Sequence, residues 1–160
     1  MGVTQPLISP SLVRKCKINE ASLTDHLDKE ARSRNMSRIR SKNTKPELMV
    51  RKMLHAAGFR FRLHDKRLPG KPDIVLPKWK TVIFVHGCFW HRHQGCKRAT
   101  IPKTRVEWWL NKFDRNIIAN DSKNCSKLLS AGWNVVIVWE CEVSHFEEIK
   151  SAIIAPLNVI

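Results

Sequence analysis

The residues best suited to chemistry form one stretch at the centre of the chain, which reads HGCFWHRHQGC from His86 to Cys96. It contains three histidines, two cysteines and an adjacent Phe-Trp pair. Imidazoles and thiolates bind transition metals, imidazoles also transfer protons near neutral pH, and aromatic rings stack on bases. The stretch therefore predicts a metal-dependent site beside a surface that binds nucleic acid.

One group of these residues has the composition of a zinc site. Three thiols and one imidazole complete a tetrahedral site around Zn²⁺, and such a fully ligated site is structural. The thiols would come from Cys88, Cys96 and the distant Cys141, and the imidazole from His91 or His93. The alternative is that these cysteines are small buried hydrophobic residues.

A second group joins a carboxylate to two histidines. Asp73 stands at the head of a predicted hairpin, where it can hold Mg²⁺, and His86 or His91 can deprotonate an attacking water. The alternative for Asp73 is a turn residue that follows Pro72. Glu47 is a further candidate, with helix capping as its alternative.

Adjacent aromatic residues form the third group. They are Phe89 with Trp90, and Trp108 with Trp109 beside a basic loop. Adjacent side chains point to opposite faces in a strand, so one ring of each pair is difficult to bury. In a cationic protein such rings can stack on bases or wedge into a duplex, whereas core packing is the default interpretation for Trp108.

The charge of the chain indicates the partner. There are 29 Lys and Arg residues against 14 Asp and Glu residues, a net charge of +15. Such a field attracts phosphates, so nucleic acid is the expected partner, with a generally adhesive, ribosome-like basic protein as the alternative. The five cysteines fit no disulfide framework, and no segment has the roughly 18 apolar residues that span a bilayer. We therefore expect a reducing compartment and no membrane partner.

The chain length suits one domain with irregular ends. Residues 1–25 are expected to be a disordered extension, residues 26–45 a basic arm, and residues 46–155 the folded domain. Met36 and Ile39 make too thin an apolar stripe for an ordinary helix, so an arm that orders on DNA is preferred. Six phosphate contacts would give a salt slope of about −5.

The elements that must position these residues follow from local pattern. Thr44 and Glu47 form a capping box for a helix ending near Gly58, and a similar pair, Thr104 and Glu107, precedes one long or two short helices. A hairpin centred near residues 78 and 79 would place Asp73 opposite Phe84. The remaining elements are strands at 59–63 and 133–139 and a closing helix at 146–154. The order predicts a mixed α/β sandwich with a central sheet.

Five motifs, in this order, resemble the very short patch repair (Vsr) DNA mismatch endonucleases. They are NMSRIR at 35–40, KNTKPE at 42–47, LPGKPD at 68–73, HGCFWH at 86–91 and VWEC at 138–141. The resemblance covers roughly residues 25–150 of the chain. It implies a fold like that of type II restriction endonucleases, a central mixed sheet flanked by helices with a structural zinc site, in a bacterial cytoplasmic protein associated with the nucleoid.

The activity implied by the resemblance is a nick on the 5′ side of the thymine in a T:G mismatch, left when 5-methylcytosine deaminates. Asp73 and the backbone carbonyl of Val85 would bind Mg²⁺; Thr is common at position 85 in the family, but a carbonyl ligand tolerates Val. His86 and His91 would be catalytic, with His91 as the general base, and Glu47 would support the water shell of the ion.

The resemblance also assigns the zinc ligands and the DNA contacts. Structural zinc would be held by Cys88, His93, Cys96 and Cys141. Phe89, Trp90 and Trp109 would enter the duplex from the major groove and Met36 from the minor groove. The arm would contact the DNA backbone through Arg32, Arg34, Arg38, Arg40 and Lys42.

Two other functions share the charge and the cysteines. One is a restriction-type endonuclease that cuts matched duplex, and the other is a non-enzymatic zinc module that only binds DNA. A pure binder would leave the group of Asp73, His86 and His91 without a purpose. The expected partner is T:G-mismatched duplex DNA, with a mismatch-repair protein as a further candidate, and a nick in one strand requires only a monomer.

Overall fold

A four-stranded mixed sheet forms the centre of the computed structural model, which describes residues 29–38, 40–102 and 104–154. The strands lie in the order β1-β2-β3-β4, antiparallel except for the parallel pair β3 and β4. The strands are β1 (Arg62–Leu63), β2 (Ile74–Leu76), β3 (Thr81–His86) and β4 (Asn134–Trp139). The predicted extension, residues 1–25, lies outside the described residues.

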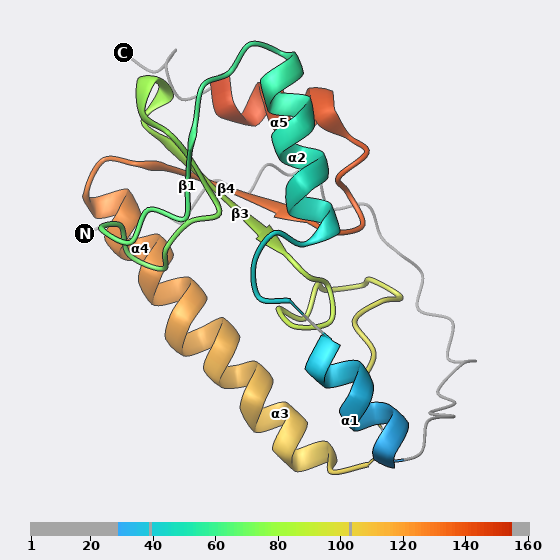
Figure 1. The fold of residues 1–160 in the computed structure, drawn as a ribbon. Helices are drawn as coiled ribbons and strands as arrows, with labels where there is room; N and C mark the ends of the chain where they lie inside the picture. Colours follow the sequence, from blue (N-terminus) through green and yellow to red (C-terminus); the bar gives the residue numbers. More distant parts are fainter. Residues whose placement is uncertain (1–28, 39, 103, 155–160) are drawn as a thin grey trace.

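Helices cover both faces of this sheet (Figure 1). On one face, α2 (Lys45–Ala56) and α5 (Phe146–Ile154) pack on alternate strand residues such as Ile74, Ile83 and Val136. On the other face, α4 (Lys123–Ser130) contributes Leu128 to a smaller cluster with Val82. The period-two alternation of the strands sends their side chains to the two layers. The predicted α/β sandwich and the closing helix are thereby confirmed.

The hairpin has the predicted register. Ile74 pairs with Ile83, so the preceding Asp73 comes opposite Phe84. A short 3₁₀ turn, η2 (Pro77–Trp79), and a left-handed Lys80 reverse the chain. The parallel pairing continues to His86 and Trp139, so the segments that leave β3 and β4 start from the same edge of the sheet.

One continuous helical rod connects β3 to β4 (Figure 1). It consists of α3 (Val106–Asp114), the π-helical η3 (Arg115–Ser122) and α4. The predicted capping box at Thr104 is wrong: Arg105 occupies the N-cap in a left-handed conformation, without a side-chain cap hydrogen bond. In a π segment each hydrogen bond spans five residues instead of four, which widens the helix and changes which side chains face the sheet.

Two local expectations differ from the structure. Part of the basic arm is a helix, α1 (Lys29–Arg38), and its described side chains are mostly exposed. The strand predicted at 59–63 pairs only through β1, and the backbone N–H of Phe59 instead donates to the carbonyl of Leu54 in α2 while its ring packs into the core. Among the helices that the structure describes, none is long and apolar enough to cross a membrane.

Candidate active site and zinc centre

The carboxylate of Asp73 is fixed at the open end of the hairpin. Its Oδ2 accepts a hydrogen bond of 2.8 Å from the backbone N–H of Val85. Burial raises the pKa of Asp73, and the nearby negative charge of Glu47 raises it further. A cation stabilises the ionised form of a buried carboxylate that lies beside a second carboxylate. This position therefore suits a metal ion.

Glu47 caps α2, as its sequence context suggested, and its carboxylate also belongs to a group that could hold a metal ion. It is 3% exposed, its Oε1 accepts a hydrogen bond from the Thr44 hydroxyl at 2.9 Å, and the full capping box is formed. Its carboxylate also lies with Asp73 and His64 in a group whose candidate ligand atoms are all within 4.8 Å of one another. The hard carboxylate oxygens of this group fit Mg²⁺.

His86 and His91 form a stacked pair beside this group. Their ring centroids are 3.8 Å apart and the rings are nearly parallel, at 10°. Burial lowers the pKa of His86 to about 3, and the adjacent His91 adds to the decrease. His86 is therefore a neutral imidazole at physiological pH.

Asp121 orients the second histidine. Its Oδ2 lies 2.6 Å from Nδ1 of His91. An ionised carboxylate can only accept hydrogen bonds, so Nδ1 of His91 carries a hydrogen and donates it to Asp121. The other ring nitrogen, Nε2, then keeps a lone pair for a proton from water. This arrangement is that of an oriented general base.

The catalytic candidates thus divide into two adjoining groups. The structure places Asp73 with Glu47, and His86 and His91 with Asp121. The two groups adjoin through β3, because Val85 holds Asp73 and His86 follows it directly. The sequence placed Asp73 with both histidines, and in the structure these residues fall in two neighbouring groups.

Two members of these groups, His64 and Asp121, escaped the sequence analysis, and so did Arg51, which donates a hydrogen bond of 2.7 Å to Glu47. Arg51 and Asp121 have the sequence context of solvated helix residues, and His64 that of a loop residue after a strand. A weak signal existed for Arg51, which stands four residues after Glu47 and so on the same helical face.

The four predicted zinc ligands converge. The nitrogen Nδ1 of His93 lies 3.7 Å from Sγ of Cys88 and 3.3 Å from Sγ of Cys141, and Cys96 belongs to the same group. Tetrahedral zinc, with its usual bond lengths, places sulfur and nitrogen ligands about 3.6 Å apart. The geometry therefore fits Zn²⁺, and it favours His93 over His91, which is paired with Asp121 instead.

The surroundings of this group also fit a metal. Burial raises the pKa values of the Cys88 and Cys141 thiols, so deprotonation needs the charge of a bound metal ion. Trp139 stacks on the ring of His93, with centroids 4.1 Å apart, and fixes its plane. Parallel pairing of β3 and β4 explains the convergence, because the ligands lie on the two segments that leave the same edge.

The aromatic residues form one connected cluster. Phe89 contacts Trp90, Trp109 and Phe113 with centroid separations of 5.0, 5.4 and 5.3 Å. The expected exposure of the tryptophan pair is reversed: Trp109 is 6% exposed and Trp108 is 42% exposed. Trp109 therefore belongs to the core of this cluster, and its entry into DNA would require the cluster to open.

A single ammonium group lies against all three tryptophans of this region. The Nζ of Lys112 is 5.3 Å from the centroid of Trp90, 4.8 Å from Trp108 and 5.6 Å from Trp109. Each distance is within the range of a cation–π contact. Lys112 thus brings positive charge to the aromatic cluster.

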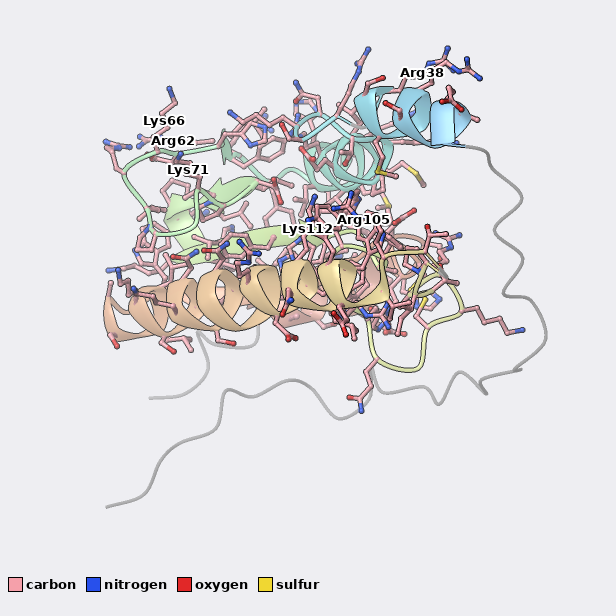
Figure 2. All side chains as sticks on the ribbon, turned by 90° about the horizontal axis from the view of Figure 1, so that it is seen from below. Arg38, Arg62, Lys66, Lys71, Arg105 and Lys112 are labelled. Carbon is pink, nitrogen blue, oxygen red and sulfur yellow. The ribbon has the colours of Figure 1, made fainter. Side chains whose placement is uncertain are left out.

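Exposed cations come from three separate parts of the fold (Figure 2). They extend from α1, from the region of β1 and from the start of α3, with Arg38, Arg62, Lys66, Lys71 and Arg105 as examples, and half-buried Lys112 lies further along α3. The predicted contacts Arg34, Arg38, Arg40 and Lys42 are exposed, and so is Met36. The side chain of Arg32 lies outside the described set.

Known proteins resemble this chain over most of its length. The sequence model of the family described as DNA mismatch endonuclease Vsr matches residues 24–98. The type II nicking enzyme V.XorIIP of Xanthomonas oryzae pv. oryzae is 47% identical over 129 residues, which are 81% of this chain and 93% of that protein. The type II nicking enzyme V.NmeAIP of Neisseria meningitidis is 49% identical, over 77% of this chain and 86% of its own.

A third relative carries the name of the family itself. The DNA mismatch endonuclease Vsr of Escherichia coli is 41% identical over 127 residues, 79% of this chain and 80% of that protein. Identities of this size over most of both chains are shared only within a family. The chain therefore belongs to the Vsr family of DNA mismatch endonucleases, whose fold is restriction-endonuclease-like, and it is a DNA endonuclease.

Proposed function

We propose that this endonuclease is Mg²⁺-dependent and nicks one DNA strand on the 5′ side of the thymine in a T:G mismatch, the product of 5-methylcytosine deamination. The observation that carries the proposal is the His91–Asp121 pair, stacked on a neutral His86 and adjoining the carboxylate of Asp73. The names of the relatives, which include a mismatch endonuclease and nicking enzymes, support it.

The histidine pair provides the base. Nε2 of His91 takes a proton from the attacking water, and the carboxylate of Asp121 stabilises the imidazolium that forms. His86 remains neutral, because its pKa is about 3, and so adds no positive charge against the protonated His91 ring 3.8 Å away. This arrangement allows His86 to act by hydrogen bonding to the phosphate.

The carboxylates provide the metal site. Asp73 and the backbone carbonyl of Val85 would bind Mg²⁺, and Glu47 would hold water around it. When bound, the ion supplies charge that polarises the scissile phosphate and favours the leaving oxygen. Asp73 is oriented for this by the N–H of Val85.

The aromatic cluster and the arm account for mismatch recognition. A T:G wobble pair stacks less well than a matched pair, so separating it from its neighbours costs less. Phe89 and Trp90 are half-buried in the cluster and would insert from the major groove, with Met36 inserting from the minor groove. Trp109 would follow only when the cluster opens.

The proposed zinc serves the same site indirectly. His91 stands between Cys88 and His93, two members of the predicted zinc tetrad. A metal that fixes both flanking residues also fixes the backbone that carries the general base. Zinc is therefore assigned a structural role, as in other sites whose four ligands all come from protein.

Strand-specific cleavage tests the proposal directly. Duplexes labelled on one strand, identical except for a T:G or a matched pair, are incubated with and without Mg²⁺. We expect a nick 5′ of the mismatched thymine that requires Mg²⁺ and disappears in Asp73→Ala. Equal cleavage of the matched duplex would favour a restriction-type enzyme, and cleavage by Asp73→Ala would refute the assigned metal site.

A further inference from the structure

Arg51 is a buried cation next to the carboxylates of the proposed metal site. It is 9% exposed and projects from α2. Nη1 donates to Oδ1 of Asn43 at 2.6 Å, and Nη2 donates to Oε2 of Glu47 at 2.7 Å. The same Nη2 lies 3.0 Å from Nε2 of His64. One guanidinium thus contacts three different segments of the chain.

Its environment is not that of an ordinary ion pair. The third nitrogen of the guanidinium, Nε, is buried without a hydrogen-bond partner. A buried charge and an unsatisfied donor both destabilise the fold, so stability alone does not explain this arginine. A positive charge next to Glu47 and Asp73 also opposes a divalent cation there. Such a residue needs a compensating role, which its geometry supplies.

Arg51 determines which nitrogen of His64 carries the proton. A guanidinium can only donate hydrogen bonds, so Nε2 of His64 must accept. The proton of the neutral ring is then on Nδ1, and Nδ1 faces Oδ1 of Asp73 at 3.8 Å. A protonated Nδ1 has no lone pair for a metal. His64 is therefore not a ligand, although its ring lies among the carboxylates.

We propose that Arg51 and His64 are positioning residues of the catalytic metal site. Arg51 orients Glu47 and the His64 ring together, and this orientation leaves Nδ1 of His64 3.8 Å from Oδ1 of Asp73. Val85 holds the other oxygen of that carboxylate, Oδ2. Val85 thus makes the hydrogen bond to Asp73, and the N–H of His64, 3.8 Å from the other oxygen, adds an electrostatic attraction that favours one orientation of the carboxylate. The inference rests on the proposed function, in which Asp73 is the metal ligand.

Only arginine can make this arrangement. Its planar fork reaches Asn43, Glu47 and His64 at once, whereas a lysine ammonium at the same place is a point charge on a flexible stem. Arg51→Lys therefore keeps the charge and removes the orientation. If the charge alone mattered, this substitution would change nothing at the metal site.

The first experiment observes the proton itself. The ring ¹⁵N shifts of His64 are measured by NMR on the full chain without DNA, at a fixed pH at which the ring is neutral. We expect the Nδ1–H tautomer in the wild type and loss of that preference in Arg51→Lys. Arg60→Lys, the same change at an exposed arginine, is the control and leaves the tautomer unchanged. An Nε2–H tautomer in the wild type, or no change in Arg51→Lys, would overturn the inference.

The second experiment measures Mg²⁺ binding by calorimetry, again without DNA. Loss of an outer hydrogen-bond partner at a metal site costs about 10-fold to 100-fold in affinity, and we expect about 10-fold for Arg51→Lys, which loses its bond to Glu47. His64→Gln removes the N–H that faces Asp73 and should weaken binding in the same direction. His64→Asn keeps an N–H near the place of Nδ1 and should stay within about threefold of the wild type. Unchanged affinity in His64→Gln would refute the positioning role.

The two proposals fail separately. If the wild type binds no Mg²⁺ at a site that depends on Asp73, the proposed function is wrong, and the His64 tautomer still decides whether Arg51 orients the ring. If the wild type binds Mg²⁺ and nicks T:G duplex while Arg51→Lys and His64→Gln match it, only the positioning role is wrong. Circular dichroism of each variant verifies that it is folded before either comparison.

Discussion

Oδ2 of Asp121 lies 2.6 Å from Nδ1 of His91, although 30 residues separate them in sequence. Asp121 belongs to η3, in the middle of the helical rod, and His91 to the loop after β3. The rod thus brings a carboxylate from outside the sheet to His91, the proposed base. His86 and His91 are stacked on each other, and it is His91 that contacts Asp121.

Asp121→Asn tests the importance of this contact. The amide keeps the size of the side chain but loses the negative charge that stabilises the imidazolium. We expect the single-turnover nicking rate on T:G duplex to fall by about 100-fold or more, the usual contribution of a general base. DNA affinity should change little, because the contact is internal.

The matched control is Asp114→Asn, the same substitution at an exposed position of the same rod. It should nick at the wild-type rate. If Asp121→Asn also remains within twofold of the wild type, His91 does not depend on Asp121 and the proposed base is wrong.

The low pKa of His86 predicts how stability depends on pH. The folded state has a pKa of about 3 and the unfolded state about 6.5, so the unfolded chain binds more protons between these values. The stabilising effect of the neutral ring is complete above pH 6.5 and is lost as the pH falls toward 3. At pH 4.5 it should lower the free energy of unfolding by about 3 kcal/mol relative to pH 7.5.

His86→Gln removes the titrating ring and isolates this effect. Urea unfolding at both pH values should show a larger loss for the wild type than for the variant, since other groups titrate in both. Equal losses in the two proteins would mean that the folded pKa of His86 is not depressed.

Local pattern was sufficient for part of the site. The turn residues around Lys78 set the hairpin, and the hairpin placed Asp73 opposite Phe84 as expected. Thr44 and Glu47 gave the capping box and the start of α2. These features depend on residues close in sequence, so they can be predicted without knowledge of the tertiary fold.

The remainder depends on contacts between distant elements. Neither Asp121 nor His64 has a neighbour in sequence that reveals its partner, and a π segment further alters the phase of the rod. The tryptophan pair shows another cause. It was judged by strand alternation, but it lies in α3, where Trp109 packs on Phe113 four residues later.

Cys141→Ser tests the predicted zinc centre. Elemental analysis should find about one zinc per wild-type chain and almost none in the variant, because three ligands hold the ion poorly without the fourth. The melting temperature should fall as well. Cys125→Ser is the control, since this cysteine lies in α4 outside the tetrad and its replacement should leave the zinc content unchanged. A folded wild type without zinc would contradict the assignment.

The two adjacent tryptophans should differ in their effect on folding. Trp109→Ala removes a buried ring and should lower the free energy of unfolding by about 3–5 kcal/mol. Trp108→Ala removes an exposed ring and should lower it by only about 1 kcal/mol, mostly through the loss of cation–π contacts. Urea denaturation of the two alanine variants without DNA measures both. Similar losses would show that the ring of Trp109 does not pack in the core.

The arm on α1 and the residues after it should determine how DNA binding responds to salt. Arg34, Arg38, Arg40 and Lys42 are all exposed, and each phosphate contact on duplex DNA contributes about 0.9 to the slope of log affinity against log salt. Replacing all four by serine should therefore reduce the slope by about 3.6, with a similar change on T:G and matched duplexes.

Fluorescence anisotropy from low to physiological salt gives this slope for each duplex. Substitution of Lys52 and Lys127, exposed cations of α2 and α4, provides the charge-loss control and should lower the slope less. A slope that stays unchanged without the four arm residues would show that they do not contact the backbone. A loss confined to the T:G duplex would instead give the arm a direct part in recognising the mismatch, because phosphate contacts alone cannot distinguish one base pair from another.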